Sequence, residues 1–340
     1  MKNDEMATDY VNVCIIGSGV VGLFLASKLL ASNISTVVLE SSNQIGGQIN
    51  LYSNKTIYNI PLIKSTSGAE ILSNLVDDIK KFSHDIYNII CLNTSIINII
   101  KEEDSFEITT NLKKVRCKYL VFAFGAGEME QNKIKIEGSE ILENNKMLFY
   151  SVNDKEKFYS KDLVICGGGD SVIDWTCELC DICKSITIVH RREINRYENP
   201  SFLKFNLLHE QGKICFKIPY NITRLSVDDK KNKLNVEILS EKDKQNIECD
   251  YILALYGFKV LPCKIIDLCR NINIDCDKNK ILVDYYSNET KCKYAYAVGD
   301  CCSYNGKINN IFMGFADATK CFYDICNREY GKIDIYEHKR

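Results

Sequence analysis

The chain has 340 residues, of which 46% are hydrophobic and 26% charged, and its formal net charge is −2. This length accommodates two domains of ordinary size, and the composition is typical of a folded protein and not of a disordered one. The nearly balanced charge gives no reason to expect nucleic acid or a membrane surface as a partner.

The N-terminal region is polar and acidic through residue 10, and the apolar run at 11–16 has only the length of a strand. A secretory signal needs a basic start and an apolar core of about 7–15 residues, and a membrane span needs about 20 apolar residues. We therefore expect a cytoplasmic protein that does not enter a membrane. The seventeen cysteines then indicate small buried side chains, because their number is odd and no export signal is visible.

The first motif is a strand, a glycine turn, a helix and a second strand. Val-Cys-Ile-Ile at 13–16 leads into the run GSGVVG at 17–22, a helical pattern continues through 30, and a strand at 35–39 ends in Glu40. In such a dinucleotide-binding unit Gly17 allows the tight turn, Gly19 lets the backbone approach the pyrophosphate, and Gly22 lets helix and strand pack. Glu40 is placed to accept hydrogen bonds from a ribose diol and would repel a 2′-phosphate, which favours FAD or NAD.

The same pattern recurs in the middle of the chain. Leu-Val-Ile-Cys at 163–166 precedes the run GGGDSV at 167–172, a helical pattern continues through 183, and a strand at 185–189 ends at His190. The spacing from first glycine to strand end is the same in both copies (17 to 40 and 167 to 190). Val172 replaces the third glycine, so we expect this helix to lie slightly farther from its strand. The candidate cofactor-binding residues of this turn are Gly167, Gly169, Asp170 and Ser171.

A basic cluster closes the second copy where the first has an acid. Arg191 and Arg192 follow His190 directly, and Arg196 lies close behind. Guanidinium groups bind phosphate through paired hydrogen bonds, so the cluster favours the 2′-phosphate of NADP(H). An isolated Arg-Arg pair would otherwise indicate only a solvated turn. At this position in a dinucleotide fold we predict an NADP site.

Two further segments indicate where a flavin would lie. The paired glycines at 46–47 permit close backbone approach to a flat ligand, and the Gln48 amide can both donate and accept at its edge. Far downstream, 294–298 is expected to form a strand that leads into Gly299 and Asp300, whose carboxylate would hold ribityl hydroxyls. A Gly-Asp pair alone is an ordinary turn. Together with the first motif it predicts an FAD site.

With these motifs assembled, the chain resembles ferredoxin–NADP reductase of the thioredoxin-reductase-like type, nearly from end to end. The matching segments are 17–23, 44–48, 51–52 with 57–61, 167–171 with 174–175, 190–192, 256–258, 299–300 and 314–315. The resemblance implies an α/β fold with two Rossmann-like dinucleotide-binding domains, the NADP domain being inserted into a discontinuous FAD domain. We expect the FAD domain at 1–124 and 257–340, and the NADP domain at 125–256.

The resemblance also implies roles for single residues and a reaction. NADPH would deliver a hydride to FAD, which would pass single electrons to two ferredoxins, so no catalytic acid or nucleophile is required. Tyr52 would stack on the flavin, and Ile96 and Met129 would contact FAD, with core packing as the alternative for both. His338 would cover the other flavin face across a homodimer, with a solvated tail as the alternative.

The main alternative function is that of an NADPH-dependent disulfide reductase of the thioredoxin type. Such an enzyme needs Cys-x-x-Cys just before the second glycine turn, where this chain has Ser151 and Asp154. Cys301 and Cys302, directly after Asp300, remain candidate thiols near the flavin. A flavoprotein that serves as a sensor and a monooxygenase are further alternatives, although both nucleotide sites look intact and no additional substrate domain is visible.

The run CELCDIC at 177–183 superficially resembles a redox or metal motif. We expect it to lie inside the helix that follows Gly169, where the thiols serve as small packing residues. Metal binding would need a fourth ligand and a loop that can surround the ion. We therefore predict no metal site.

Overall fold

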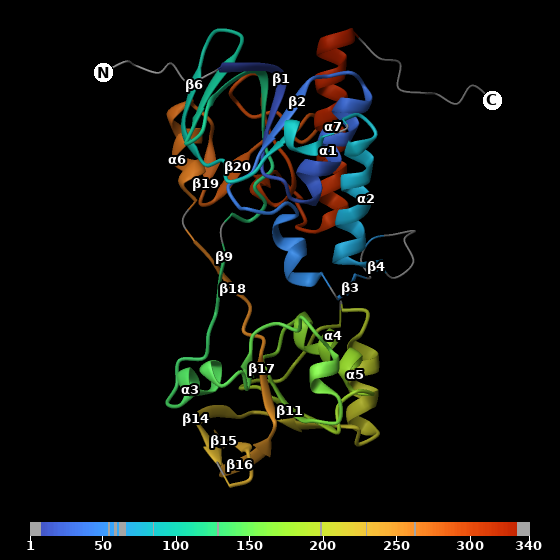
Figure 1. Cartoon of the computed structure of the whole chain (residues 1–340), viewed down its shortest axis with the longest axis vertical. Coiled ribbons are helices and arrows are strands. Elements are labelled where there is room, and N and C mark those ends of the chain that lie inside the picture. The colour runs from blue at the N-terminus through green and yellow to red at the C-terminus, as the bar shows by residue number, and fades with distance from the viewer. Residues whose placement is uncertain are drawn as a thin grey trace, which may run out of the picture. The chain divides into compact units, whose positions relative to one another are not determined.

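The structure is a computed structural model that describes residues 8–53, 55–57, 60, 66–83, 85–127, 129–197, 199–228, 230–261 and 263–331. The chain divides into two compact units (Figure 1). Unit 1 consists of residues 1–128 and 260–340, and unit 2 of residues 129–259. Unit 1 is therefore discontinuous in sequence, and unit 2 is inserted into it.

Unit 1 is built on a seven-stranded sheet in the order β5-β2-β1-β8-β7-β6, with β21 also paired to β8. β1, β2, β5, β8 and β21 are parallel, while β6 and β7 add antiparallel strands at one edge. The strands are β1 (Thr8–Ile16), β2 (Thr36–Leu39), β5 (Ile90–Cys91), β6 (Ile96–Lys101), β7 (Phe106–Thr110), β8 (Lys114–Phe122) and β21 (Ala295–Ala297).

Helices cover both faces of this sheet because its central strands are apolar on both sides. Alternate residues of β1 point to opposite faces. Val13 and Ile15 belong to the core beneath α1, α2 and α7, whereas Cys14 and Ile16 belong to the core beneath α6. Figure 1 shows the three helices together on one side and α6 with β19 and β20 on the other. The helices are α1 (Val20–Ala31), α2 (Gly68–Lys80), α6 (Lys264–Asn271) and α7 (Ile311–Tyr330).

Short elements complete unit 1. Strands β3 and β4 form one pair, and β19, β20 and β22 form a three-stranded sheet. The remaining elements are η1 (Gly47–Tyr52), β3 (Thr56–Ile57), β4 (Thr66–Ser67), η2 (Ile86–Asn88), β19 (Cys276–Asp277), β20 (Lys280–Leu282), η4 (Gly299–Cys301) and β22 (Cys302–Ser303).

Unit 2 repeats the arrangement on a smaller scale. Its parallel sheet has the order β10-β17-β11-β12-β13, and β14, β15 and β16 form a separate antiparallel sheet. Strands β9 (Met129–Gln131) and β18 (Phe258–Val260) pair with each other. The other elements are α3 (Ser139–Asn144), β10 (Leu148–Phe149), η3 (Glu156–Phe158), β11 (Asp162–Cys166), α4 (Asp170–Leu179), β12 (Ser185–Val189), α5 (Phe202–Glu210), β13 (Ile214–Lys217), β14 (Asn221–Asp228), β15 (Lys233–Leu239), β16 (Lys244–Cys249) and β17 (Tyr251–Ala254).

The five strands predicted from the sequence are all present, but the second helix is shorter than predicted. α4 ends at Leu179, so Cys180 is its C-cap and Cys183 lies beyond it. The chain turns there, and the Ser160 amide donates a hydrogen bond to the carbonyl of Ile182 at 2.9 Å. The expected burial of the cysteines is confirmed, since eleven of the seventeen are buried.

Candidate functional site

The first glycine turn follows β1, and two of its glycines have no room for a side chain. Gly17 has φ of +107°, a backbone conformation that other residues rarely adopt, and a methyl group on it would lie 2.6 Å from the Ala123 carbonyl oxygen. A methyl group on Gly22 would lie 2.2 Å from the carbonyl oxygen of Gly17. These contacts hold the turn and α1 tightly against the strand, as the sequence pattern predicts.

Gly19 differs from these two glycines because its surroundings are open. A methyl group on Gly19 would meet no atom within 4 Å. Gly19 is the N-cap of α1, and the first turn of that helix has no acidic residue and receives no side-chain cap. The exposed amides and positive end of the helix therefore face space that an anion can enter. This arrangement fits a pyrophosphate.

Glu40 directly follows β2 beside the glycine turn, and its carboxylate accepts hydrogen bonds from backbone and hydroxyl donors. Its Oε2 accepts hydrogen bonds from the Ser18 amide at 2.9 Å and the Ser18 hydroxyl at 2.8 Å, while Oε1 accepts one from the Ser42 amide at 2.9 Å. Carboxylate oxygens have further lone pairs, so the group can still accept from a ribose diol. Sequence reasoning did not include Ser18, although its place between Gly17 and Gly19 is a usable signal.

The segment around Gly46 packs directly on the glycine turn. The Gly46 amide donates to the Ser18 carbonyl at 2.9 Å, and a methyl group on Gly47 would lie 3.4 Å from the Cα of Gly19. The Gln48 Nε2 lies 3.5 Å from the position of a methyl group on Gly125. The structure therefore brings the glycine turn, Gln48 and the loop after β8 together.

Tyr52 lies at the end of η1, a few residues after Gln48. The Lys55 ammonium nitrogen lies 5.4 Å from the centroid of the Tyr52 ring, which is a cation–π distance. Of the segment 57–61 that completes the resemblance, Ile57 and Ile60 belong to the described residues.

Two segments from the C-terminal part of unit 1 meet the first turn of α1. A methyl group on Gly299 would lie 3.3 Å from Val21, and one on Gly314 would lie 2.5 Å from Val21. Gly299 starts η4, which places the half-buried Asp300 beside the same turn. Residues near 20, 300 and 314 therefore surround one end of α1. The role of Asp300 toward a ribityl chain stays a prediction.

Cys301 and Cys302 follow Asp300 but are not reactive thiols. Both are fully buried. The Cys301 thiol lies 3.2 Å from both the Phe122 and the Val298 carbonyl oxygens, and the Cys302 thiol donates to the Gly299 carbonyl at 3.1 Å. Burial raises the pKa of Cys301 to about 12 and also raises that of Cys302. Thiolates are the reactive form, so these two side chains act as packing and hydrogen-bonding groups.

The second glycine turn, in unit 2, repeats the geometry of the first. Gly167 has φ of +133°, and a methyl group on it would lie 2.5 Å from the Leu255 carbonyl oxygen. A methyl group on Gly169 would meet nothing within 4 Å. Val172 is accommodated, with its Cγ2 3.0 Å from the position of a methyl group on Gly167. Gly169 is again the N-cap of the helix, here α4.

The start of α4 differs from that of α1 in charge. Asp170 and the partly buried Ser171 form its first turn, so this helix presents an acid where α1 has none. The Asn199 amide nitrogen donates to Asp170 at 3.1 Å and to Asp174 at 3.3 Å. Asn199 was missed from sequence because it comes from a loop 29 residues downstream.

The basic cluster stands at the end of β12, beside the second glycine turn. The ring of His190 packs on Gly168, where a methyl group would lie 2.4 Å from its Nε2. Burial lowers the pKa of His190, and the charges of Arg191, Arg192 and Arg196 lower it further. Arg191 and Arg192 are exposed. Within 129–197 and 199–228, neither of these two guanidinium groups forms an ion pair, so both can bind an added phosphate.

The other predicted residues are more scattered. Ile96 begins β6 and packs on the core beneath α6, and Met129 begins β9 in unit 2. His338 lies outside the described residues. Ser151 and Asp154 are exposed residues of the segment after β10.

The CELCDIC run shows no sign of a redox or metal site. Burial raises the pKa of Cys177 to about 11 and of Cys183 to about 12, and it also raises that of Cys180. Over the described part of the chain, no group of three or more His, Cys, Asp or Glu side chains is placed to hold a metal ion.

Comparison with solved structures supports the fold. Thioredoxin reductase of Lactococcus lactis in its FR conformation has a TM-score of 0.69 at 21% identity, covering 93% of this chain and 97% of its own. Thioredoxin reductase of T. acidophilum also has a TM-score of 0.69, at 20% identity, covering 94% and 99%. The predicted α/β fold with two dinucleotide-binding domains is confirmed.

Comparison with curated sequences is more specific. Ferredoxin–NADP reductase of Ligilactobacillus salivarius is 35% identical, over 90% of this chain and 88% of its own. The proteins of that name from Orientia tsutsugamushi (strain Ikeda) and Rickettsia typhi are each 34% identical, over 94% and 96% of this chain and 93% and 96% of their own. Residues 11–319 match the family described as pyridine nucleotide-disulphide oxidoreductase. With paired glycine turns, end-to-end similarity and this match, the chain belongs to the pyridine nucleotide-disulphide oxidoreductase family, among relatives that are ferredoxin–NADP reductases.

Proposed function

We propose that this protein transfers electrons between NADPH and ferredoxin, with FAD bound in unit 1 and NADP(H) in unit 2. The observation that carries the proposal is a pair of dinucleotide-binding units whose second strands are followed by opposite charges. Glu40 follows β2 in unit 1, and Arg191 and Arg192 come after β12 in unit 2. Similarity to ferredoxin–NADP reductases supports ferredoxin as the partner. Bound FAD supplies the conversion between a two-electron hydride and single electrons.

In unit 1, the residues of the chain bind and orient FAD. The open space at Gly19 and the positive end of α1 suit the pyrophosphate. Glu40 accepts hydrogen bonds from the ribose, and Gln48 and Tyr52 lie toward the flavin edge and ring. The fourth side chain is Asp300, which holds ribityl hydroxyls. We also propose that Ile96, Met129 and His338 contact FAD.

In unit 2, Gly169 leaves the corresponding open space for the pyrophosphate of NADP(H). The free guanidinium groups of Arg191 and Arg192 bind the 2′-phosphate, with Arg196 adding positive charge. Burial and these arginines lower the pKa of His190, whose ring packs against Gly168. The chain thereby selects NADPH over NADH.

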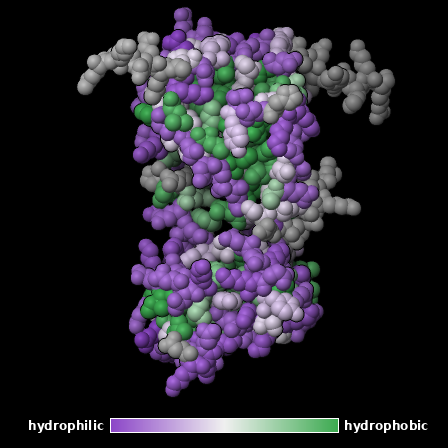
Figure 2. Space-filling view, viewed as in Figure 1, coloured by the Kyte–Doolittle hydropathy of each residue, from purple (hydrophilic) through white to green (hydrophobic). Residues whose placement is uncertain are grey.

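We further propose a cytoplasmic homodimer. Exposed apolar side chains of unit 1, such as Ile308 and Phe312, support contact with another protein chain. Figure 2 shows a hydrophobic area on the visible face of this unit. No helix among the described residues combines the length and the apolar character that a membrane crossing requires. The formal net charge of −2 supports no nucleic-acid partner.

The disulfide-reductase alternative lacks thiols where its chemistry needs them. Ser151 and Asp154 occupy the positions of the redox cysteines before the second glycine turn. Cys301 and Cys302 are buried and protonated. If the alternative held, NADPH would drive reduction of thioredoxin, and Cys301→Ser or Cys302→Ser would abolish it. We expect no thioredoxin reduction in either the native protein or these variants.

The central test is anaerobic mixing of the purified yellow protein with NADPH, followed by a cytochrome c assay with and without ferredoxin. We expect NADPH to bleach the flavin absorbance and ferredoxin to accelerate cytochrome c reduction. Bleaching without any ferredoxin dependence would overturn the assignment of the partner. FAD binding without bleaching would point to a nucleotide-binding sensor.

Replacing the free arginines tests the NADP site. Arg191→Ala and Arg192→Ala should each raise the Michaelis constant for NADPH by roughly tenfold, which corresponds to about 1.5 kcal/mol for one charge-assisted contact. The constant for NADH should stay nearly unchanged. Arg224→Ala is the matched control, because this exposed arginine of unit 2 is paired with Glu137. An equal rise for both nucleotides would contradict the proposed role.

A further inference from the structure

Two cysteines of unit 1 lie side by side although the thiol chemistry of the family is absent here. Cys269 is in α6 and is fully buried, while Cys276 begins β19 and is partly exposed. Both side chains pack in the core beneath α6, and each thiol shifts the pKa of the other. The chain folds back between them, with the Ile274 amide donating to the Cys269 carbonyl at 3.0 Å. The buried Cys269 thiol therefore lies on the core side of the partly exposed Cys276 thiol.

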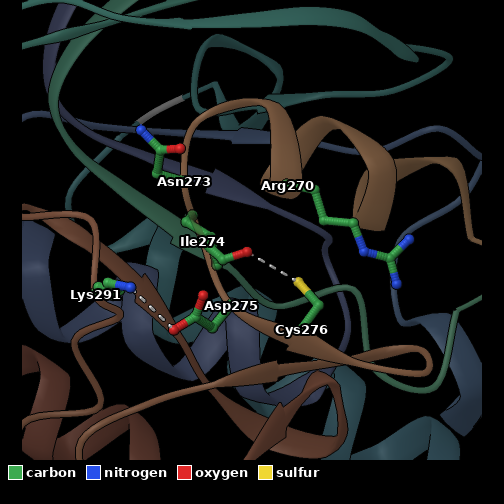
Figure 3. Close-up of a pocket in the computed structure, with 6 residues that line it drawn as sticks. All are labelled: Arg270, Asn273, Ile274, Asp275, Cys276 and Lys291. Atoms are coloured by element: carbon green, nitrogen blue, oxygen red, sulfur yellow. Dashed lines mark hydrogen bonds and ion pairs between the residues drawn. The ribbon is translucent and has the colours of Figure 1, made fainter.

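The Cys276 thiol also borders a surface cavity of about 510 Å³. Figure 3 shows Cys276 beside Arg270 on the cavity wall, with its sulfur directed to the Ile274 carbonyl oxygen at 3.6 Å. Asp275 and Lys291, which form an ion pair of 3.6 Å, line the opposite part. Cys276 is thus partly exposed at this cavity, whereas Cys269 is fully buried and does not line it.

The surroundings favour the thiolate of Cys276. The hydrogen bond from the Cys269 thiol lowers the pKa of Cys276, and the Arg270 charge lowers it further, against the opposing effects of burial, Asp275 and Asp267. The same hydrogen bond and burial raise the pKa of Cys269. A pair with one ionisable, accessible sulfur and one protonated sulfur behind it matches an attacking and a resolving cysteine.

We propose that Cys276 and Cys269 form a peroxide-oxidised dithiol, a modification site separate from electron transfer to ferredoxin. The Cys276 thiolate attacks one oxygen of hydrogen peroxide, the O–O bond breaks, and hydroxide leaves. The sulfur is oxidised by two electrons to a sulfenic acid while the peroxide is reduced. Cys269 then loses its proton and attacks the Cys276 sulfur, the S–O bond breaks, and water leaves as the disulfide forms. An added dithiol reduces the disulfide by exchange.

Tryptic peptides report this disulfide directly in the whole protein. Cleavage after Lys264, Arg270 and Lys278 places Cys269 on peptide 265–270 and Cys276 on peptide 271–278. After treatment with hydrogen peroxide and blocking of free thiols, mass spectrometry should find the two peptides joined, and dithiothreitol should separate them. Absence of the joined peptides in oxidised native protein would overturn the proposal without any variant.

Variants assign the order of attack. In Cys269→Ser the sulfenic acid of Cys276 has no resolving thiol, so dimedone should label peptide 271–278. In Cys276→Ser both the joined peptides and labelling of Cys269 should be lost. Cys215→Ser, which removes the exposed cysteine of β13, is the control and should leave the joined peptides unchanged. Labelling of Cys276 no faster than that of Cys215 would contradict the proposal.

Discussion

Replacing Asp317 by Asn should destabilise unit 1 by about 3–5 kcal/mol, because it leaves a buried lysine without its counter-charge. Asp317 lies in α7 with a fully buried side chain and forms an ion pair with Lys307, whose side chain is 4% exposed. The Asp317 carboxylate also accepts a hydrogen bond from the Tyr304 hydroxyl at 2.7 Å. Asn keeps the shape and one acceptor but removes the charge. The expected loss is a large part of the roughly 5–15 kcal/mol that stabilises an ordinary domain.

Urea unfolding measures this loss, with circular dichroism reporting the whole chain. Trp175, the single tryptophan, lies in α4 and reports unit 2 alone. The matched control is Asp77→Asn, which breaks an exposed Asp77–Lys80 pair of α2 whose side chains are 59% and 54% exposed. Such exposed pairs contribute about 1 kcal/mol or less. If Asp317→Asn shifts the unfolding midpoint no further than Asp77→Asn, the reasoning from burial is refuted.

Three further substitutions test the glycine turn and the acid stability. Gly22→Ala should reduce the free energy of unfolding by about 1–3 kcal/mol, since its methyl group meets the Gly17 carbonyl at 2.2 Å. Gly19→Ala should leave urea stability unchanged but lower the flavin-to-protein absorbance ratio, and the opposite pattern would contradict the open-site assignment. Burial alone would raise the pKa of Asp162, but hydrogen bonds from Lys233, Ser185 and Lys184 outweigh it and lower the pKa to about 2. Because the folded pKa lies below the unfolded value of 3.8, Asp162 contributes on the order of 2 kcal/mol above pH 4 and loses this contribution as the pH falls toward 2. Asp162→Asn should remove that part of the acid dependence in unfolding titrations, and an unaltered pH profile would show that the hydrogen bonds contribute nothing.

Much of the nucleotide-binding architecture is predictable because it is encoded locally. The strand, turn and helix around Gly17 occupy one continuous segment, and the same holds around Gly167. In such segments the need for glycine and the periodicity of apolar residues can be recognised from the sequence without knowledge of distant contacts. Glu40 and the basic run that begins at His190 directly follow their strands at the same spacing from these glycines, so the contrast between an acid and the arginines was also visible.

Local sequence did not determine features that depend on contacts from another part of the chain. The pattern after Gly169 predicted a helix through 183, but a hydrogen bond from Ser160 to Ile182 marks a turn there, and α4 ends at Leu179. Cys301 and Cys302 were candidate thiols by position. Packing against the sheet buries them and raises their pKa values.

The sequence alone determined the two dinucleotide folds and the opposite charges that follow their second strands. These features follow from short-range sterics and from charges at known strand ends. Only the tertiary structure decided that Val21 meets both Gly299 and Gly314, that Lys307 is buried against Asp317, and that Cys269 stands behind Cys276. Pairings of this kind depend on how β21, α6 and α7 pack on the sheet. They join segments that are far apart in the chain, and no local pattern contains that information.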